Sequence, residues 1–274
     1  MSGFLDEMAR SSTARVRAAQ QLESFAELER RARGTPPAPA LRLSSTRFDV
    51  IAELKLRSPA AGQLGRESQD WQGRIAAYAR GGAAAVSVLT EPSRFDGSLE
   101  HLRQAAATLA PLQVPAMRKD FLVDPYQVLE ARAAGAGGIL VILRMLPLER
   151  VAALLDAAAE HGLFVLLEAF DEADLESARQ LLATRRRVET LLVGINSRDL
   201  QSLKVVPERF AALAPMLPKA CACVAESGVA SPSDAQAMRR LGYRLALIGT
   251  ALMNCDDPAA MVAEILDGAR TPHR

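Results

Sequence analysis

The sequence is poor in the residues that most often build metal, disulfide and cofactor sites. Its 274 residues include three cysteines and three histidines, and aromatic residues make up only 4%. Cys221 and Cys223 lie two apart in a predicted strand, where they share a face but are badly placed to bond each other. With Cys255 they are interpreted as small core residues in a reducing cytoplasm. No second Cys pair or His cluster completes a zinc site, so the sequence predicts no metal.

Motifs of several enzyme classes are also missing. The chain contains no G-x-G-x-x-G, no P-loop and no G-x-S-x-G elbow, which argues against dinucleotide binding, nucleotide hydrolysis and serine-hydrolase chemistry. His101, His161 and His273 fall in a predicted helix, at a helix end and in the tail. None of the three is therefore a candidate catalytic base. The chemistry expected is acid–base catalysis by Lys and Glu, without cofactor or metal.

An excess of either charge is missing too. The chain has 33 basic and 32 acidic residues, for a net charge of +1, which argues against nucleic acid or a membrane surface as partner. No apolar run reaches the roughly 18 residues of a membrane span. Residues 1–10 carry Asp6, Glu7 and Arg10 instead of the apolar segment of a secretory signal. The sequence predicts a soluble cytoplasmic protein that acts on a small molecule.

What the sequence does contain is a regular alternation of strands and helices from residue 49 onward. Strands are expected at 49–54, 84–89, 114–118, 138–143, 163–168, 190–196, 221–226 and 244–249. Helices are expected at 70–81, 98–109, 125–134, 147–161, 171–183, 207–216, 232–241 and 257–269. Eight such units predict a (β/α)8 TIM barrel. A doubly wound sheet fits less well, because Lys55-Leu-Arg-Ser-Pro stands where its glycine-rich turn would be.

The first forty-odd residues form a separate part of the pattern. Residues 3 to about 33 are predicted to be helical, with a second segment capped by Ser12 or Thr13. A proline-rich stretch then stops any helix. We expect residues 1–47 to be a helical extension packed over one end of the barrel. Residues 48–274 form the barrel, and the two together make one structural domain.

Charged side chains stand at the ends of several apolar strands, where a soluble protein rarely places them without a reason. Glu53 and Lys55 are two apart, so they face the same side of the first strand. An ion pair that merely fills the barrel is the structural alternative. Lys119 ends the third strand directly before Asp120, and the apolar run before it favours a functional role over a surface lysine. In a TIM barrel such strand ends surround the active site.

The fifth and sixth strands end in the same way. Glu168 closes LFVLLE, a strand with no other polar side chain, and a carboxyl group withdrawn from water there suits proton transfer. Asn196 and Arg198 repeat the spacing of two, and an amide beside a guanidinium suits an anionic or hydroxyl-bearing ligand. Arg198 could equally pair with Asp199. These residues predict one shared pocket.

The last two strands end differently, in Glu226-Ser-Gly and Ile248-Gly-Thr, which combine small residues with free backbone N–H groups. Ser227 and Gly228 follow the seventh strand, and Gly249 and Thr250 follow the eighth. TIM barrels often bind phosphate in these two loops, where backbone N–H groups approach the ligand closely. A single glycine is weak evidence because turns need glycine anyway. Their position after these two strands predicts a phosphate site.

The motifs together resemble those of the indole-3-glycerol phosphate synthase family of tryptophan biosynthesis. The resemblance runs from about Phe48 to Asp257 and includes the N-terminal helical extension. The matching stretches are AELKLRSP, SVLTEPSRFDGS, RKDFLVDPYQ, EARAAGAGGIL, LLEAF, GINSRDL, AESGV and LIGTALM. The resemblance implies a carboxy-lyase that closes 1-(2-carboxyphenylamino)-1-deoxyribulose 5-phosphate to indole-3-glycerol phosphate. Carbon dioxide and water are lost in that reaction.

The resemblance also implies roles for the proton-transfer residues. Lys119 is similar to the general acid that protonates the ketone oxygen while the aromatic carbon attacks. Glu168 is similar to an acid/base group for the later proton transfers. Glu53 and Asn196 are similar to residues that position the chain hydroxyls and the other catalytic groups. Lys55 resembles the lysine near the substrate carboxylate and phosphate, for which the resemblance also implies a share in the dehydration. Which lysine donates which proton stays open.

Substrate contacts follow from the same resemblance. Arg198 is similar to the electrostatic partner of the substrate carboxylate, and Ser58 to the serine of the first loop. Phe95 and Phe121 resemble the aromatic contacts, and Glu226 the carboxylate beside the phosphate loop. The partner implied is a small phosphorylated substrate, and the chain is expected to be a monomer or a weak homodimer.

Three positions depart from the family pattern. Ala60 stands in SPAAG where a serine is usual, Ser197 replaces a common second Asn in GINSRDL, and Gly137 replaces the usual Asp. None is a proton-transfer residue, so the sequence predicts an active enzyme. Gly137 is expected to loosen the entry to the fourth strand. Ala60 is expected to alter closure of the first loop over substrate.

Two rival interpretations stand beside this one. Phosphoribosylanthranilate isomerase is also a phosphate-binding barrel, but that family has a Cys at the end of the first strand, where this chain has Glu53 and Lys55. A catalytically inactive barrel kept as a scaffold would lack acid–base groups. The presence of all six polar strand-end residues argues against it.

Overall fold

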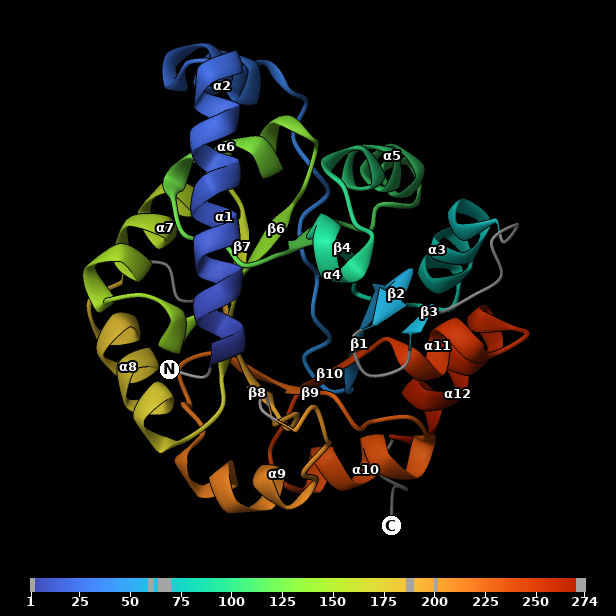
Figure 1. Cartoon of the computed structure of the whole chain (residues 1–274). Helices are drawn as coiled ribbons and strands as arrows, with labels where there is room; N and C mark the ends of the chain where they lie inside the picture. Colours follow the sequence, from blue (N-terminus) through green and yellow to red (C-terminus); the bar gives the residue numbers. More distant parts are fainter. Residues whose placement is uncertain (1–2, 59–61, 64–69, 186–189, 200–201, 270–274) are drawn as a thin grey trace.

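Eight parallel strands form a closed barrel at the centre of the molecule (Figure 1). This computed structural model describes residues 3–58, 62–63, 70–185, 190–199 and 202–269. Neighbours along the chain pair in parallel, and β1 closes the ring by pairing with both β4 and β10. The strands are β1 (Asp49–Leu54), β4 (Ala85–Leu89), β5 (Ala116–Lys119), β6 (Gly138–Ile142), β7 (Phe164–Ala169), β8 (Leu191–Asn196), β9 (Ala222–Glu226) and β10 (Leu245–Ile248). The predicted (β/α)8 TIM barrel and its eight strands are confirmed.

Side chains of each strand point alternately into the barrel and outward to the helices, because strand side chains alternate with a period of two. On β1, Ile51 belongs to the apolar core inside the barrel, whereas Val50 and Ala52 pack between barrel and helices. All six residues of β1 are buried, as expected for a parallel strand covered on both faces. Glu53 shares the inward direction of Ile51, so its carboxylate enters the barrel.

The eight predicted helices cover the outside of the barrel (Figure 1). They are α3 (Trp71–Arg80), α5 (Leu99–Leu109), α6 (Pro125–Ala133), α7 (Leu148–Glu160), α8 (Glu172–Ala183), α9 (Glu208–Leu213), α10 (Pro232–Arg240) and α12 (Pro258–Gly268). Helix α9 ends earlier than predicted, because the next segment, Ala214–Met216, contains Pro215 and forms a 3-10 turn.

Several short elements in the loops were not predicted. Helix α4 (Pro92–Phe95) follows β4, and α11 (Thr250–Asn254) follows β10. Two further 3-10 turns span Ala110–Leu112 and Leu143–Met145. After β1, the two-residue strands β2 (Arg57–Ser58) and β3 (Gly62–Gln63) pair antiparallel. Such short elements lack the repeated apolar spacing that indicates a helix or strand in a sequence.

The N-terminal extension is two helices, α1 (Gly3–Leu22) and α2 (Phe25–Gly34). The predicted helix start at Ser12 or Thr13 is wrong, since both lie inside α1. Thr13 donates its hydroxyl hydrogen bond to the Ala9 carbonyl, as Thr does within a helix. The break comes at Ser24, which caps α2 in a reciprocal capping box with Glu27.

Helix α1 lies across one end of the barrel in Figure 1, with the ring of outer helices around it. Leu5 and Met8 of α1 are fully buried, and they belong to the same apolar cluster as the residues inside the barrel. Deeper in the helix, Ser12 is buried and accepts a hydrogen bond from the Gln127 side chain of α6. Helix α1 is therefore packed on the barrel through a face that carries both apolar and polar side chains.

Gly137, at the entry to β6, sits in a tightly packed place. A Cβ atom there would lie 2.7 Å from the Pro115 Cβ and 3.1 Å from the Pro39 carbonyl oxygen of the linker after α2. The Gly137 amide donates to the Ala116 carbonyl at 2.8 Å, and its carbonyl accepts from Phe164 at 2.9 Å. The expected loosening of this strand entry is therefore not seen, because glycine here admits the linker.

No helix in the described part of the chain combines the length and apolar character that a membrane span requires.

Candidate active site

A cavity of about 440 Å³ opens at the carboxyl ends of the barrel strands. Every barrel strand contributes at least one residue to its wall, and α1 contributes Phe4 and Leu5. The structure brings together here nearly all of the residues that the sequence singled out, namely Glu53, Lys55, Phe95, Lys119, Phe121, Glu168, Asn196, Arg198, Glu226, Ser227, Gly228, Gly249 and Thr250. The side chain of Ser58 and the whole of Ala60 lie outside the described residues.

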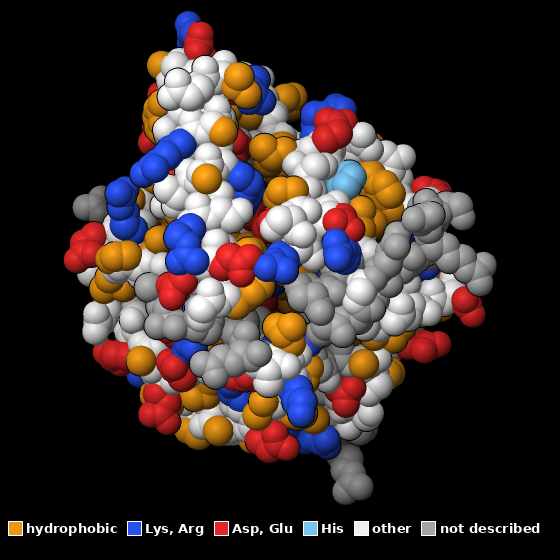
Figure 2. All heavy atoms as spheres, in the orientation of Figure 1, with side chains coloured by type: hydrophobic (Ala, Val, Ile, Leu, Met, Phe, Trp, Pro, Cys, Tyr) orange, Lys and Arg blue, Asp and Glu red, His pale blue; other side chains and the backbone are white. Residues whose placement is uncertain are grey.

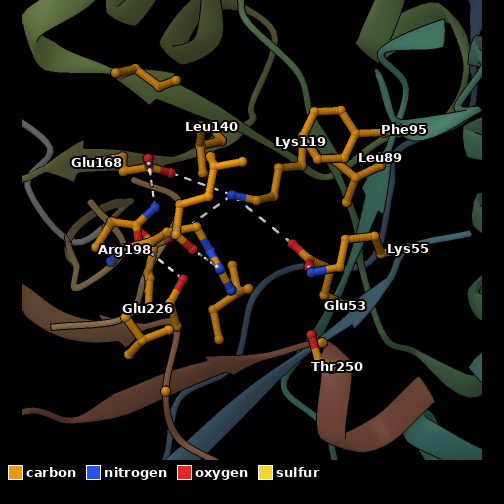
Figure 3. Close-up of a pocket in the computed structure, with 18 of the residues that line it drawn as sticks. Glu53, Lys55, Leu89, Phe95, Lys119, Leu140, Glu168, Arg198, Glu226 and Thr250 are labelled. Atoms are coloured by element: carbon orange, nitrogen blue, oxygen red, sulfur yellow. Dashed lines mark hydrogen bonds and ion pairs between the residues drawn. The ribbon is translucent and has the colours of Figure 1, made fainter. Parts of the chain in front are cut away.

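Lys119 is the centre of the pocket's charge (Figure 3). Its Nζ lies 3.3 Å from Glu168 Oε2, 3.8 Å from Glu226 Oε2 and 4.0 Å from Glu53 Oε2. Burial alone would lower the pKa of Lys119, but the three surrounding carboxylates outweigh it and raise that pKa. The lysine is therefore held as an ammonium ion that carries three donors into the cavity.

Glu53 and Lys55 form the predicted pair at the end of β1, with Lys55 Nζ 3.1 Å from Glu53 Oε1. Burial would raise the pKa of Glu53, but Lys55 and Lys119 lower it. Both side chains line the cavity, so the pair does not merely fill the barrel below it. Gly249 makes room for the pair, because a Cβ at that position would lie 2.5 Å from Glu53 Oε1.

Glu168 is held by donors from two sides. The Asn196 side-chain amide donates to Oε1 at 3.0 Å, and Lys119 Nζ donates to Oε2 at 3.3 Å. The Asn196 side-chain oxygen in turn accepts from the Arg198 amide and from the Ser227 hydroxyl, each at 2.9 Å. Asn196 therefore orients Glu168 and ties β8 to the loop after β9.

Glu226 is the carboxyl group in this pocket that lacks donors. Its side chain is 1% exposed, and neither oxygen has a hydrogen-bond partner in the described part of the chain. Burial and the nearby Glu168 carboxylate raise the pKa of Glu226 well above its ordinary value, although Lys119 opposes them. The sequence had pointed to Glu168 as the desolvated acid. In the structure both carboxyl groups are buried, but Asn196 and Lys119 direct their donors to Glu168 and leave Glu226 without any from the described residues.

The loops after β9 and β10 form the other side of the cavity. Ser227 and Gly228 both have positive φ angles, of 67° and 87°, so this loop bends in a way that glycine tolerates best. Gly249 precedes α11, and Thr250 begins it. Backbone N–H groups in such bends and at helix starts suit an anionic ligand. All four predicted phosphate residues line the same cavity.

Aromatic side chains close the cavity on the α1 side. The Phe121 and Phe95 ring centroids are 6.2 Å apart, and the Phe4 ring packs edge-on against Phe121 at 5.8 Å. Neither Phe4 nor Leu5 was predicted as a site residue. Their spacing with Met8 marks the buried face of α1, but it does not say which surface that face covers.

Arg198 and Ser197 lie next to each other where β8 leaves the barrel. Arg198 lines the cavity and donates from Nη1 to the Leu203 carbonyl at 2.7 Å. Ser197, one of the departures from the family pattern, is fully buried, and its hydroxyl donates to the Ser227 carbonyl at 2.8 Å. The serine thus still supports the loop that follows β9.

None of the described cysteines or histidines lines the cavity. Cys223 is buried in the core between barrel and helices, and Cys221 packs against that core. The described cysteines are unpaired thiols, in agreement with the interpretation as core residues. His101 packs edge-on against Trp71, and His273 lies outside the described residues.

One surface group does place three potential metal ligands within 4.8 Å of one another, Glu29, Glu160 and His161. Arg33 already forms ion pairs with both of these carboxylates. The group is therefore a charged contact between α2 and α7, remote from the cavity.

The fold and the cavity together define a TIM-barrel enzyme that has a lysine among carboxylates and small-residue loops after its last two strands. Two solved structures share the fold at 14% identity: thiamine phosphate pyrophosphorylase from Pyrococcus furiosus and 3-hexulose-6-phosphate synthase from Salmonella typhimurium. Their TM-scores are 0.57 and 0.60, with 81% of this chain covered in both cases and 95% and 98% of the respective structures. At such identity they establish the fold alone.

Sequence comparison establishes the family. A family model described as indole-3-glycerol phosphate synthase matches residues 5–265. Proteins of that name from Parafrankia sp. and Rhizorhabdus wittichii are 41% and 37% identical. The first alignment covers 91% of this chain and 90% of the relative, and the second covers 98% and 100%. The chain belongs to the indole-3-glycerol phosphate synthase family.

Membership of this family fixes the reaction class. The enzyme is a carboxy-lyase of tryptophan biosynthesis that acts on a small phosphorylated substrate. It closes the ring of 1-(2-carboxyphenylamino)-1-deoxyribulose 5-phosphate, with loss of carbon dioxide and water, to give indole-3-glycerol phosphate.

Proposed function

We propose that the cavity at the carboxyl ends of the strands is where this ring closure occurs, with Lys119 as the general acid. The observation that carries the proposal is the position of Lys119 Nζ, within 4.0 Å of Glu53, Glu168 and Glu226. As the aromatic carbon attacks the ketone carbon, the ketone oxygen gains negative charge and takes a proton from Nζ. An ammonium ion beside a developing alkoxide stabilises the charge that forms in the transition state.

The carboxylates around Lys119 raise its pKa, so the lysine enters the reaction protonated. A lysine that stays protonated at neutral pH is ready to donate when the alkoxide forms. The carboxylates that raise its pKa also fix the direction of Nζ, so the donor is oriented before the substrate arrives. Loss of carbon dioxide then restores the aromatic ring and leaves a hydroxyl group to be eliminated as water.

Glu168 and Lys55 are proposed for the elimination of that hydroxyl group. Glu168 exchanges protons as acid or base, while Asn196 holds its carboxylate in direction. Lys55, paired with Glu53 at the mouth of β1, lies near the substrate carboxylate and phosphate and shares in the dehydration. Glu53 also positions the chain hydroxyl groups.

The remaining lining residues are proposed to bind the substrate. Phe95 and Phe121 contact its aromatic ring, and Arg198 faces its carboxylate. Glu226 lies beside the phosphate loop, where burial raises the pKa of its carboxyl group. The phosphate is proposed to bind Ser227, Gly228, Gly249 and Thr250. Ser58 of the first loop is proposed as a further contact.

We infer a cytoplasmic monomer or weak homodimer that binds no nucleic acid, with residues 1–47 as an extension of the barrel formed by 48–274. On the face drawn in Figure 2, Lys and Arg side chains are interspersed with Asp and Glu, which does not favour a polyanion. The burial of Leu5 in the barrel core supports one structural unit.

The test of the catalytic assignment is Lys119→Ala. We expect turnover, followed by the fluorescence of the indole product, to fall below detection, while binding of substrate to the folded variant remains measurable by calorimetry. Lys219→Ala is the matched control, since Lys219 is exposed and does not line the cavity. Near wild-type turnover by Lys119→Ala would contradict the assignment of the acid.

A further inference from the structure

Gly194 lies in the middle of β8 and faces the inside of the barrel. Its neighbours two residues away are Leu192, which belongs to the inner apolar core, and Asn196, which lines the cavity. The backbone does not require glycine here, because the positive φ angles found at Gly228 and Gly242 are not found at Gly194. Glycine in the interior of a strand is otherwise unfavourable. Glycine must therefore be needed here because a side chain at this position would not fit.

The space above Gly194 is filled by the Glu226 side chain. In the β8–β9 register Asn196 pairs with Glu226, and Gly194 pairs with Val224, one layer deeper in the barrel. The Glu226 carboxyl group therefore folds toward the barrel floor. A Cβ atom on residue 194 would lie closer than 3.0 Å to Glu226 Oε1, and 3.1 Å from Leu166 on another side. No side chain fits at 194 while Glu226 keeps its place.

We propose that Gly194 is a positioning residue, which acts by leaving the space in which the Glu226 carboxyl group lies beside Lys119. The inference rests on the part proposed above for Glu226 in the reaction. A methyl group at 194 pushes the carboxyl group up toward the mouth of the cavity. The separation of 3.8 Å between Glu226 Oε2 and Lys119 Nζ then changes, and the carboxyl group enters the volume that the substrate needs. Gly194 itself touches no substrate.

A double-mutant cycle tests this inference. The four proteins are the wild type, Gly194→Ala, Glu226→Ala and the double variant, each measured for kcat, KM and thermal midpoint. We expect Gly194→Ala to lower kcat roughly 10- to 100-fold, the scale of a small misplacement of a catalytic group, and to lower the midpoint. In the Glu226→Ala background the same change should alter neither quantity, because the clash is gone.

Two further variants separate the cause. Glu226→Gln keeps the volume of the side chain, so combining it with Gly194→Ala should retain the full loss of midpoint. Gly138→Ala is the matched overpacking control, because Gly138 also faces into the barrel and a Cβ there would clash with the Phe164 ring. We expect Gly138→Ala to lose stability equally in the wild-type and Glu226→Ala backgrounds.

The outcomes distinguish this inference from the function it rests on. Equal losses caused by Gly194→Ala in both backgrounds would overturn the inference, as would a wild-type kcat in Gly194→Ala. If Gly194→Ala does not fold, the double variant decides: a folded double variant supports the inference, and an unfolded one overturns it. A wild-type kcat in Glu226→Ala would remove Glu226 from the reaction and overturn both.

Discussion

Two neighbouring residues at the end of β5 lie in buried charge clusters of opposite character. Lys119 points into the cavity among three carboxylates, one of which, Glu226, has no donor for either oxygen in the described part of the chain. Asp120 is 2% exposed and accepts from Arg15, Arg118, Thr90 and its neighbour's backbone amide. Both oxygens of Asp120 are satisfied.

The difference in hydrogen-bond partners distinguishes a cluster that stabilises the fold from a cluster that can take part in chemistry. A buried charge with all its partners holds structure together, and removing one partner leaves another charge stranded. The Asp120 cluster joins α1, through Arg15, to β5, through Arg118. A buried group whose oxygens accept from no protein donor can still interact with a bound molecule. We therefore propose that the cluster around Lys119 is the one that contacts the ligand.

The largest effect on stability is expected from Asp120→Asn. Arg118 is buried with 2% of its side chain exposed, and it would keep Glu130 at 2.9 Å but lose the Asp120 carboxylate at 3.1 Å. We expect the free energy of unfolding in urea to fall by about 3–5 kcal/mol, the usual cost of breaking a buried ion pair. Asp256→Asn, at an exposed site, is the control. A loss below about 1 kcal/mol would show that the Asp120 cluster does not anchor α1.

Glu226→Gln should behave in the opposite way. Gln keeps the volume of a neutral Glu, so we expect kcat to fall more than tenfold while stability near pH 5 stays within about 1 kcal/mol of wild type. A loss of stability as large as that of Asp120→Asn would contradict the comparison.

The pH dependence of unfolding sharpens the contrast between the two carboxyl groups. Burial and Glu168 raise the pKa of Glu226 in the folded state, so its contribution to stability is present below its unfolded value of about 4.3 and is lost as pH rises. Glu226→Gln should therefore gain stability relative to wild type from pH 4 to pH 8. Equal pH profiles of the two proteins would contradict this expectation.

The pKa of Asp120 is shifted in the opposite direction to that of Glu226. Burial opposes the effect, but Arg15 and Arg118 lower the pKa of Asp120. Its contribution is therefore present above its unfolded value of about 3.9 and is lost as pH falls further. The difference in unfolding free energy between wild type and Asp120→Asn should shrink below pH 4. A constant difference from pH 7 to pH 3 would contradict the assigned direction.

The sequence predicted the strands and most of the pocket because both follow from short-range rules. Inward positions recur every second residue, and parallel strands end at one shared edge, so Glu53, Lys119, Glu168 and Glu226 had to converge. It could not predict which carboxyl group lacks donors. That depends on the directions of side chains from different strands and on the space left by Gly194.

The position of α1 against the barrel could not be predicted from the sequence either. Its apolar spacing indicates a buried face, but this spacing does not show which surface of the molecule that face covers. The same limit applies to Gly137, which looked like a loss of an acidic side chain and is instead the contact that admits Pro39. Contacts between segments far apart in the chain decide both cases.

The smallest effect is expected at Phe4, in the first turn of α1. Helix α1 is held by Arg15 on Asp120, and its first turn brings Phe4 edge-on against Phe121 at 5.8 Å. Phe4→Leu keeps an apolar side chain but loses the aromatic contact, worth about 0.5–1.5 kcal/mol. We expect KM to rise roughly 2- to 10-fold with kcat nearly unchanged, because Phe4 lines the cavity and packs its apolar ring against Phe121. Leu22→Ala, on the same helix but 90% exposed, is the control in steady-state assays. A fall in kcat as large as that of Glu226→Gln would mean that α1 acts on Lys119 itself, and the division between a structural and a chemical cluster would have to be abandoned.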